Sequence, residues 1–427
     1  MDALASGLLA LGIRAGDRVG IWSPNRVEWL LTQFATARMG AVLVNINPAY
    51  RLAELEYALN KVGCKAVIVD DVMRTGRDQL DSTTLDALEA KLNPNESINI
   101  QFTSGTTGNP KGATLTHRNI VNKARYIAMA MRLTEHDSLC IPVPLYHCFG
   151  MVLAVLACVS TGCVTVFPGE AFDPGATLTA VHDEKCTALH SVPTMLIAEL
   201  DHPDFAKYDF SHLRTGIMAG SPCPIETMKR VVSKIHLSEI TIAYGMAETS
   251  PVSFQSSTTD PLDKRTTTVG RIQPHLEVKI IDPLGNIVPV GETGELCTRG
   301  YSVMKGYWGD DEKTREAIVD GWMHTGDLVT LDTQGYCNIV GRLKDMLIRG
   351  GENIYPREIE EFLFRHPKVQ SVQVFGVPDE KYGEEVCAWI VVRPREQATE
   401  DEMRDFYKGK SHIIRFPVTF ASSTNFR

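Results

Sequence analysis

The chain has 427 residues, 44% of them hydrophobic, and a formal net charge of −9. This length predicts about three domain-sized units, or one large and one small domain, around an ordinary buried core. The negative charge argues against nucleic-acid binding, which requires clustered lysine and arginine. The ten cysteines are scattered without a Cys-x-x-Cys pair, so we expect reduced core residues, with neither a disulfide framework nor a zinc site.

Neither a targeting peptide nor a membrane span is expected from the residues present. Positions 1–16 have an amphipathic helix pattern with Asp2 and no arginine before Arg14, unlike a signal or transit peptide. The uncharged stretch 139–169 is interrupted by prolines and glycines, so its pieces are shorter than the roughly 20 residues that span a bilayer. We predict a buried helix over 151–159 and a buried strand over 163–167 instead.

The first 100 residues alternate between helix and strand patterns. Helices are expected over 1–16, 25–39 and 52–62, and strands over 18–22, 41–44 and 66–69. These strands are short, continuously apolar and β-branched, which is typical of a parallel sheet covered on both faces. The polar stretch 70–97 predicts a surface helix and a linker.

The same alternation continues after a strand over 98–102. A helix is predicted over 119–131 and strands over 138–143, 187–189, 215–219 and 239–244, whereas 269–341 has short alternating strands with turns. A helix over 356–365, strands over 369–377 and 385–392, and a helix over 400–408 form a last group. The expected fold class is therefore α/β, with a large N-terminal domain of αβ layers plus a β-rich unit, and a small α+β C-terminal domain.

A loop rich in glycine and hydroxyl side chains separates the strand over 98–102 from the apolar run 113–115. It comprises Thr103, Ser104, Gly105, Thr106, Thr107, Gly108, Asn109, Pro110, Lys111 and Gly112. Glycines let backbone N–H groups approach an anion, hydroxyls add donors, and a lysine supplies a charge for phosphate oxygens. The loop predicts a phosphate cradle, although it lacks the Gly-Lys-Ser/Thr ending of a Walker A loop. The alternative is a plain Gly/Ser/Thr-rich hairpin turn.

A second candidate segment follows the strand over 239–244, where open α/β sheets place ligands. Tyr244 offers a ring for stacking on a base, and Glu248 offers a hard oxygen ligand for Mg²⁺. Taken alone, Glu248 is better read as an acid at a helix N-terminus.

Three further sites have both a functional and a plain structural reading. Asp327 is either a ligand for ribose hydroxyls or a turn aspartate, and Arg342 precedes a charged cluster that otherwise reads as a solvated linker. Gly350 and Gly351 form a turn that lets a thin ligand pass close to the backbone, or a plain hairpin. His147 alone reads best as a satisfied core histidine.

Five motifs in this order resemble the adenylate-forming superfamily, which holds acyl-CoA synthetases, luciferase and peptide-synthetase adenylation domains. They are Thr-Ser-Gly-Thr-Thr-Gly-Asn-Pro-Lys-Gly at 103–112, Tyr-Gly-Met-Ala-Glu-Thr at 244–249, Gly-Glu-Leu-Cys-Thr-Arg-Gly at 294–300, Thr-Gly-Asp at 325–327 and Gly-Arg-Leu-Lys-Asp at 341–345. Closer wording, such as Gly-Tyr-Trp-Gly at 306–309, resembles the medium-chain acyl-CoA synthetases of the family-member-2 type.

The resemblance implies a role for each matched residue. Thr103 to Lys111 would cradle the ATP phosphates with Thr106 and Glu248 near Mg²⁺, and Lys111, Thr106, Glu248 and His147 would be catalytic. Gly220, Ser221, Tyr244, Gly245, Thr249, Asp327 and Arg342 would complete the ATP site. Lys344 would be the hinge between domains 1–343 and 344–427, and Gly350 and Gly351 would line the CoA route.

The resemblance also implies a reaction. A fatty acid would be activated by ATP to an acyl-adenylate and transferred to CoA, with an acyl pocket built from 151–156, 192–194 and 219–221. The alternatives are an inactive relative that binds nucleotide or acyl ligand, and a peptide-synthetase-like adenylation domain. ATP, CoA and the fatty acid are the expected partners. Relatives are mitochondrial, but no import signal is present, so a cytoplasmic location is also open.

Three departures from the family pattern bear on activity. Ala247 replaces a threonine expected at the α-phosphate, and no lysine follows Lys410 where the family has a Gly-Lys turn. The family also carries more chain before Met1 and between residues 69 and 98. We therefore expect impaired adenylation, with transfer from a supplied acyl-adenylate retained.

Overall fold

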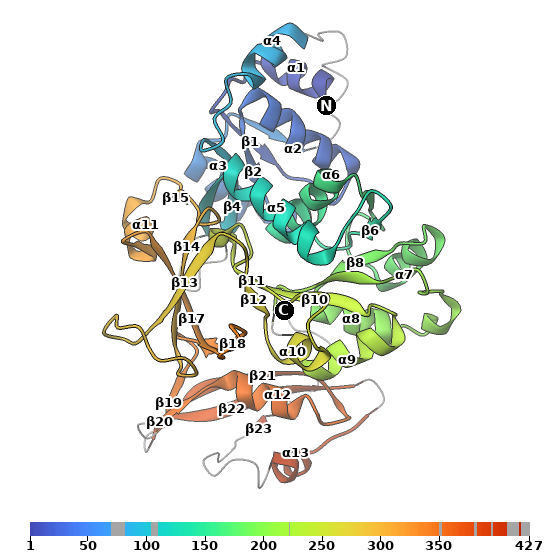
Figure 1. The fold of residues 1–427 in the computed structure, drawn as a ribbon, viewed down its shortest axis with the longest axis vertical. Helices are drawn as coiled ribbons and strands as arrows, with labels where there is room; N and C mark the ends of the chain where they lie inside the picture. The colour runs from blue at the N-terminus through green and yellow to red at the C-terminus, as the bar shows by residue number, and fades with distance from the viewer. Residues whose placement is uncertain are drawn as a thin grey trace.

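The structure, a computed structural model, describes residues 1–69, 82–103, 110–221, 223–349, 352–379, 382–393, 396–407 and 418–419. The described strands form four sheets, three in a large N-terminal domain and one in a smaller C-terminal domain. Figure 1 shows the small domain at the bottom, below α9, α10 and β18, and the first sheet at the top.

The first sheet has the order β15-β5-β4-β2-β1-β3. Its strands are β1 Arg18–Ile21, β2 Val42–Asn45, β3 Ala66–Ile68, β4 Ser97–Thr103, β5 Lys111–Thr116 and β15 Gly306–Tyr307, and helices α1 Asp2–Ala10, α2 Val27–Met39, α3 Leu52–Val62 and α4 Ser82–Glu89 accompany them. The predicted parallel pairing is confirmed for β1 to β4. The sheet as a whole is mixed, because β5 pairs antiparallel with β4, and β15 pairs antiparallel with β5.

The second sheet has the order β12-β11-β10-β9-β8-β6-β7, and helices α5 to α10 lie before and between its strands along the chain. The strands are β6 Ser138–Cys140, β7 Val164–Val166, β8 Ala188–Ser191, β9 Thr215–Met218, β10 Glu239–Tyr244, β11 Phe254–Gln255 and β12 Arg271–Ile272. The helices are α5 His117–Met131, α6 Ala157–Thr161, α7 Pro174–Asp183, α8 Pro193–Leu200, α9 Ile225–Lys234 and α10 Leu262–Thr267, with one-turn helices η3 Phe205–Lys207 and η4 Ala247–Thr249. The predicted α/β alternation is confirmed.

Two predictions on the uncharged stretch need correction. The strand near 163–167 is not buried, because β7 is the outer strand of its sheet and Val164 is 55% exposed. The helix near 151–159 begins as a π-helix, η2 Phe149–Leu156, before α6 continues it. A run of apolar residues does not reveal which sheet edge is uncovered or how tightly a helix is wound.

The third sheet is antiparallel, as the texture of 269–341 predicts. It consists of β13 Leu276–Ile281, β14 Gly294–Gly300, β16 Ile318–Val319, β17 Trp322–Leu331 and β18 Cys337–Arg342, with α11 Asp311–Ala317 beside it. The small domain contains β19 Leu347–Arg349, β20 Glu352–Ile354, β21 Val369–Asp379, β22 Gly383–Val392 and β23 Val418–Thr419, with helices α12 Pro356–Leu363 and α13 Glu400–Tyr407. The predicted large and small domains are confirmed.

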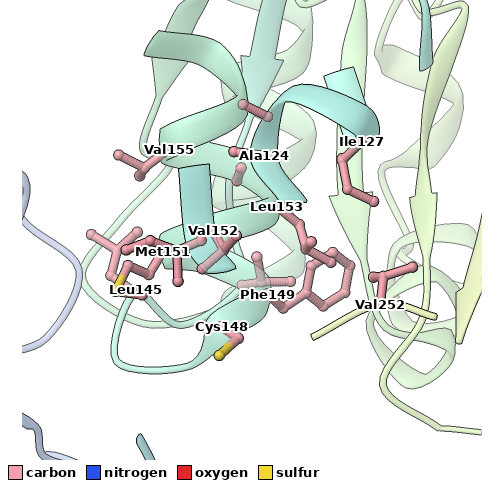
Figure 2. Close-up of a cluster of buried hydrophobic side chains, with 14 of the residues drawn as sticks. Ala124, Ile127, Leu145, Cys148, Phe149, Met151, Val152, Leu153, Val155 and Val252 are labelled. Carbon is pink, nitrogen blue, oxygen red and sulfur yellow. The ribbon is translucent and has the colours of Figure 1, made fainter. Parts of the chain in front are cut away.

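The largest core cluster joins the first two sheets through α5 and η2. Met151, Val152 and Leu153 of η2 are 0 to 2% exposed and belong to the same cluster as Ala124 and Ile127 of α5 (Figure 2). Helix α5 begins at a capping box in which Thr116 Oγ1 accepts from the Asn119 N–H at 3.2 Å. The small domain has a core cluster of its own, which includes Leu347, Leu363 and Ile390.

Nine of the ten cysteines are buried and all ten are free, which confirms the prediction of reduced core residues. Among the described residues, no helix combines the length and apolar character that crossing a membrane requires.

Lys123 of α5 is a fully buried lysine in this core. Its Nζ donates to Gln273 Oε1 at 3.1 Å and lies 5.1 Å from the centroid of the Tyr301 ring. The polar chain continues as Gln273 Nε2 donates to Gln255 Oε1 at 2.6 Å. Burial lowers the pKa of Lys123 to about 7, because the low-dielectric interior disfavours the charged ammonium.

Lys123→Met is expected to change the pH dependence of stability. Between pH 7 and the ordinary lysine pKa, the unfolded chain binds a proton that folded Lys123 has lost, so the stability of the native chain rises with pH. The slope is at most about 1.4 kcal/mol per pH unit. Urea unfolding at pH 7 and pH 9 should show this gain in the native chain and its loss in Lys123→Met. The surface variant Lys234→Met, at the exposed end of α9, should behave like the native chain; equal slopes in all three proteins would contradict the assignment.

Candidate active site

The predicted phosphate loop connects two antiparallel strands. Thr103 at the end of β4 pairs in register with Lys111 at the start of β5, and Thr103 Oγ1 donates to the Lys111 carbonyl at 3.5 Å. The residues between, Ser104, Gly105, Thr106, Thr107, Gly108 and Asn109, lie outside the described residues. Pairing of the flanking strands agrees with the hairpin reading, and a hairpin of this composition can also cradle phosphate.

Tyr307 lies between Lys111 and Glu248. Its hydroxyl donates to Glu248 Oε1 at 2.8 Å, and Lys111 Nζ is 5.0 Å from the centroid of its ring. Glu248 is only 5% exposed. Two motifs separated by more than 130 residues therefore meet at one side chain, as a single nucleotide site would require.

Glu248 lies in η4, the one-turn helix that follows β10 and packs against β5. The Met304 N–H donates to the Glu248 carbonyl at 2.8 Å, so the backbone is also held there. Glu248 does stand in the first turn of η4, as the alternative of an acid at a helix N-terminus predicts, but its carboxylate is also buried and bound by a phenol. A buried carboxylate beside a lysine and a phosphate-type loop suits a hard cation such as Mg²⁺.

A second group is formed by Tyr244, Asp327 and Arg342. The Tyr244 hydroxyl donates to Asp327 Oδ2 at 2.5 Å, and Arg342 Nε lies 3.2 Å from Asp327 Oδ1. Asp327 belongs to β17 and pairs in register with Arg342 of β18, so it is not a turn aspartate. Arg342 is exposed, but it lies in β18 and pairs with Asp327, so it is not part of a solvated linker. Burial raises the pKa of Asp327, and the bond from Tyr244 and the charge of Arg342 oppose that rise.

Glu295 of β14 holds the part of β17 that leads to Asp327. Its Oε1 accepts from the Gly326 N–H at 3.1 Å and its Oε2 lies 3.0 Å from His324 Nδ1. Cys297 Sγ is close to both side chains, so the three could hold a metal ion. Both glutamate oxygens already contact β17, which gives the group a structural role.

Residues 1–308 match the AMP-binding enzyme family, and residues 358–418 match the AMP-binding enzyme C-terminal domain. The chain is 49% identical to the putative acyl-CoA synthetase YngI of Bacillus subtilis, over 97% of this chain and 85% of that protein. It is 44% identical to the mitochondrial medium-chain acyl-CoA ligase ACSF2 of Danio rerio, over 98% of this chain and 78% of that protein. The chain belongs to the AMP-binding enzyme family.

Solved structures of the family agree in fold. The ATP-bound MatB of Rhodopseudomonas palustris has a TM-score of 0.86 at 29% identity, with 99% of this chain and 88% of that chain covered. The anthranilate CoA ligase AuaEII in complex with anthranoyl-AMP has a TM-score of 0.88 at 25% identity, with 99% and 87% covered. The adenylate-forming fold and the acyl-CoA synthetase resemblance are thereby confirmed.

Four other predicted ATP contacts of this AMP-binding enzyme differ in how their side chains and backbone are placed. Gly220 and Ser221 follow β9 and are exposed, with Gly220 at φ +88°. Gly245 is needed for packing, because an added Cβ would lie 2.0 Å from the Pro251 carbonyl oxygen. Thr249 is fully buried, and its hydroxyl donates to the Met246 carbonyl at 3.0 Å, so this arrangement does not present it to a ligand.

His147 is exposed, so the reading as a satisfied core histidine is wrong. Although the residue is exposed, the surrounding protein desolvates the imidazole, and this desolvation lowers the pKa of His147. Its Nδ1 accepts from the Phe149 N–H at 3.2 Å, which fixes the ring at the start of η2. Burial, with a smaller contribution from the charge of Glu248, raises the pKa of the neighbouring Cys148 thiol.

One segment of the predicted acyl pocket lies in the largest core cluster. Residues 151–155 are buried in the core cluster, beside a second histidine that the sequence did not single out. His190 is fully buried and its Nε2 lies 3.0 Å from the Leu153 carbonyl; because a carbonyl only accepts, Nε2 carries the proton. Burial lowers the pKa of His190 to about 4, so the ring is neutral and this region remains uncharged at pH 7.

The predicted hinge lies between the two domains in sequence. Lys344 is exposed and falls between β18 of the third sheet and β19 of the fourth. Gly350 and Gly351 lie outside the described residues, and the strands on either side, β19 and β20, pair antiparallel. The roles of these residues stay predictions.

Sequence reasoning missed Tyr307 and Glu295 as residues of the site. Both stand in quoted motifs, Gly-Tyr-Trp-Gly and Gly-Glu-Leu-Cys-Thr-Arg-Gly, and only the fold reveals their contacts. It also missed a buried amide chain behind the loop, where Gln101 Nε2 donates to Asn99 Oδ1 at 2.9 Å and Asn99 Nδ2 to Asn45 Oδ1 at 2.8 Å. Amides inside an apolar strand were the available signal.

Gly245→Ala is expected to destabilise the folded chain. The added methyl group would overlap the Pro251 carbonyl, and overpacking of this kind costs about 2 kcal/mol, which lowers the melting temperature of a chain of this size by about 2 to 3 °C. Gly169→Ala is the matched control, since its Cβ would lie 3.4 Å from the nearest atom, in ordinary contact. Thermal unfolding should separate the two variants; the same melting temperature for both would refute the packing role.

Proposed function

We propose that the chain activates a medium-chain fatty acid with ATP to give an acyl-adenylate and pyrophosphate, and then transfers the acyl group to CoA. The observation that carries this proposal is the meeting of Lys111 and Glu248 at Tyr307. The ACSF2 and acyl-CoA synthetase relatives support the fatty-acid and CoA chemistry, and the ATP-bound and acyl-AMP-bound neighbours support the use of ATP.

The proposed roles follow from charge and position. Residues 103–111 hold the phosphates, with the Lys111 ammonium on their oxygens, and Asp327 accepts the ribose hydroxyls while Arg342 lies beside it. The Tyr244 ring faces the base. Glu248 holds Mg²⁺, which when bound neutralises charge on the phosphates. The carboxylate of the fatty acid attacks the α-phosphorus and pyrophosphate leaves, so positioning and charge neutralisation carry the step.

The second step uses the small domain. We place the boundary at residues 343 and 344, with Lys344 as the hinge and Gly350 and Gly351 along the CoA route. In the present arrangement Arg393 of the small domain lies 3.3 Å from Asp201 of the large domain, and Asp201 also lies 2.6 Å from Arg230. Rotation about the hinge would break the first ion pair, and partly exposed pairs such as this one break at little cost.

Location is carried over from relatives. The vertebrate relatives are named mitochondrial and one relative is bacterial, so a mitochondrial location is proposed through the former alone.

Tyr244→Phe is expected to move the pH dependence of ATP binding. Ribose recognition needs ionised Asp327, whose pKa is already raised by burial; removing the Tyr244 hydroxyl raises that pKa further. ATP binding should therefore be lost at a higher pH in the variant, with the acid limb displaced upward by about one pH unit. Calorimetry from pH 5 to pH 8 measures it. Tyr208→Phe, which loses a remote phenol near Thr179, is the control; coincident profiles would contradict the role of Asp327.

The two half-reactions should separate in the 427-residue chain. Fatty-acid-dependent ATP–pyrophosphate exchange is expected to be weak, because Ala247 stands where the family has a threonine hydroxyl for the α-phosphate. Losing one such hydrogen bond costs about 1 kcal/mol, or about fivefold in rate. Thioester formation from supplied acyl-adenylate and CoA should proceed. Ala247→Thr should raise exchange and leave thioester formation unchanged. Exchange at the same rate in both proteins would contradict the impairment, and failure of both half-reactions would favour the inactive, ligand-binding alternative.

A further inference from the structure

Tyr307 is fixed more firmly than its place in a two-residue strand suggests. Tyr307 pairs with Ala113 across β15 and β5, and the next residue, Trp308, donates its N–H to the Gly112 carbonyl at 2.8 Å. The Tyr307 N–H donates to Thr314 Oγ1 of α11 at 2.8 Å. The side chain is 7% exposed, so its ring and hydroxyl are held from several sides.

The two charged groups at Tyr307 do not pair with each other. Lys111 forms no ion pair within the described part of the chain, although the ring over which its ammonium lies binds a buried carboxylate through its hydroxyl. An ammonium over an aromatic face is attracted by the ring quadrupole without losing its charge. A phenol that donates to a carboxylate likewise leaves the negative charge of the carboxylate in place. Only Oε1 of Glu248 accepts this bond, and Oε2 receives no bond from the described residues.

We propose that Tyr307 is a positioning residue that holds Lys111 and Glu248 apart, so that the ammonium stays available for phosphate and one carboxylate oxygen for Mg²⁺. Without the ring, opposite charges so close in a partly buried site would form a direct ion pair and cancel as ligand-binding groups. The phenol also directs Glu248, because it binds Oε1 and leaves Oε2 toward the cation. This inference rests on the proposed function, and it assigns to Tyr307 a task that no motif assigns.

The shift in the phenol's own acidity is consistent with this geometry. Burial, with the nearby Glu248 carboxylate, raises the pKa of Tyr307 well above its ordinary value. The hydroxyl therefore stays protonated and keeps donating throughout the working pH range.

Two substitutions separate the functions of the hydroxyl and the ring. Tyr307→Phe keeps the ring beneath Lys111 and removes the donor to Glu248, so ATP should still bind without Mg²⁺ as in the native chain. The enhancement of ATP binding by MgCl₂ should fall about tenfold, the effect of one hydrogen bond to a charged group. Tyr307→Leu removes both, so ATP binding should fall with and without MgCl₂. Isothermal calorimetry with ATP, in EDTA or in MgCl₂, measures all four affinities.

A third variant tests the ion pair directly. In Tyr307→Leu, adding Glu248→Gln should restore much of the Mg²⁺-free ATP affinity, because the lysine loses its competing carboxylate. In the native background, Glu248→Gln should abolish the response to MgCl₂ and change Mg²⁺-free binding much less than it does in Tyr307→Leu. This non-additivity is the signature of a spacer and is not expected from general loosening of the fold.

A matched tyrosine controls for structural damage. The Tyr336 hydroxyl donates to Asp260 Oδ1 at 2.8 Å, and the Arg271 guanidinium lies 3.9 Å from the centroid of its ring, so Tyr336 makes the same two kinds of contact away from the site. Tyr336→Phe should lower the melting temperature about as much as Tyr307→Phe and leave the MgCl₂ response unchanged.

The outcomes distinguish this inference from the proposed function. If the native chain binds ATP with a MgCl₂ enhancement and Tyr307→Phe shows the same enhancement, the positioning role is refuted and the proposed function stands. If Glu248→Gln fails to restore binding in Tyr307→Leu, the spacer role is refuted in the same way. If the native chain does not bind ATP, both are overturned.

Discussion

The short strand β15 pairs with the edge of β5, and the arrangement of the site depends on this pairing. It returns the chain to the first sheet almost 200 residues after that sheet's other strands, and it places Tyr307 beside Lys111. Helix η4, which follows β10 of the second sheet, also lies against β5, and Glu248 of η4 therefore reaches the Tyr307 hydroxyl. Backbone hydrogen bonds between strands thus determine which side chains meet, and they bring the charged groups of Lys111 and Glu248 to Tyr307.

Buried carboxylates of this protein are often bound by tyrosine. Glu248, Asp327 and Asp260 each accept a hydrogen bond from a phenol. A phenol stabilises the carboxylate without neutralising it, whereas the guanidinium of Arg214, 2.7 Å from Asp137, compensates its charge fully. Where a carboxylate has to meet a cation or a sugar hydroxyl from outside, a neutral donor keeps that capacity. The buried lysine of α5 is handled in the same manner, with an amide oxygen and an aromatic ring as its partners.

The division into domains fits a site with two successive tasks. The groups proposed to bind the nucleotide belong to the three sheets of the large domain. The small domain has its own core and touches the large one through partly exposed polar pairs such as Arg393 with Asp201. An interface of this type permits relative motion, because its contacts exchange readily with water. The phosphate-binding and ribose-binding groups would then stay fixed while the small domain changes position.

Much of the secondary structure and several candidate site residues can be predicted from residues that are neighbours in the sequence. The alternation of helices and strands, the β-rich stretch and the two domains follow from apolar periodicity and turn residues, and Lys111, Glu248, Tyr244 and Asp327 stand out by their chemistry next to glycines and strand ends. These properties depend on neighbours in the chain, so they can be read along it.

The tertiary structure alone decided how these residues combine. The antiparallel addition of β5 and β15, the uncovered edge at β7 and the exposure of His147 depend on contacts between segments far apart in sequence. Tyr307 illustrates the limit: its motif is visible in the chain, but its position between an ammonium and a carboxylate arises because hydrogen bonds of one sheet join strands that the sequence separates by about 190 residues.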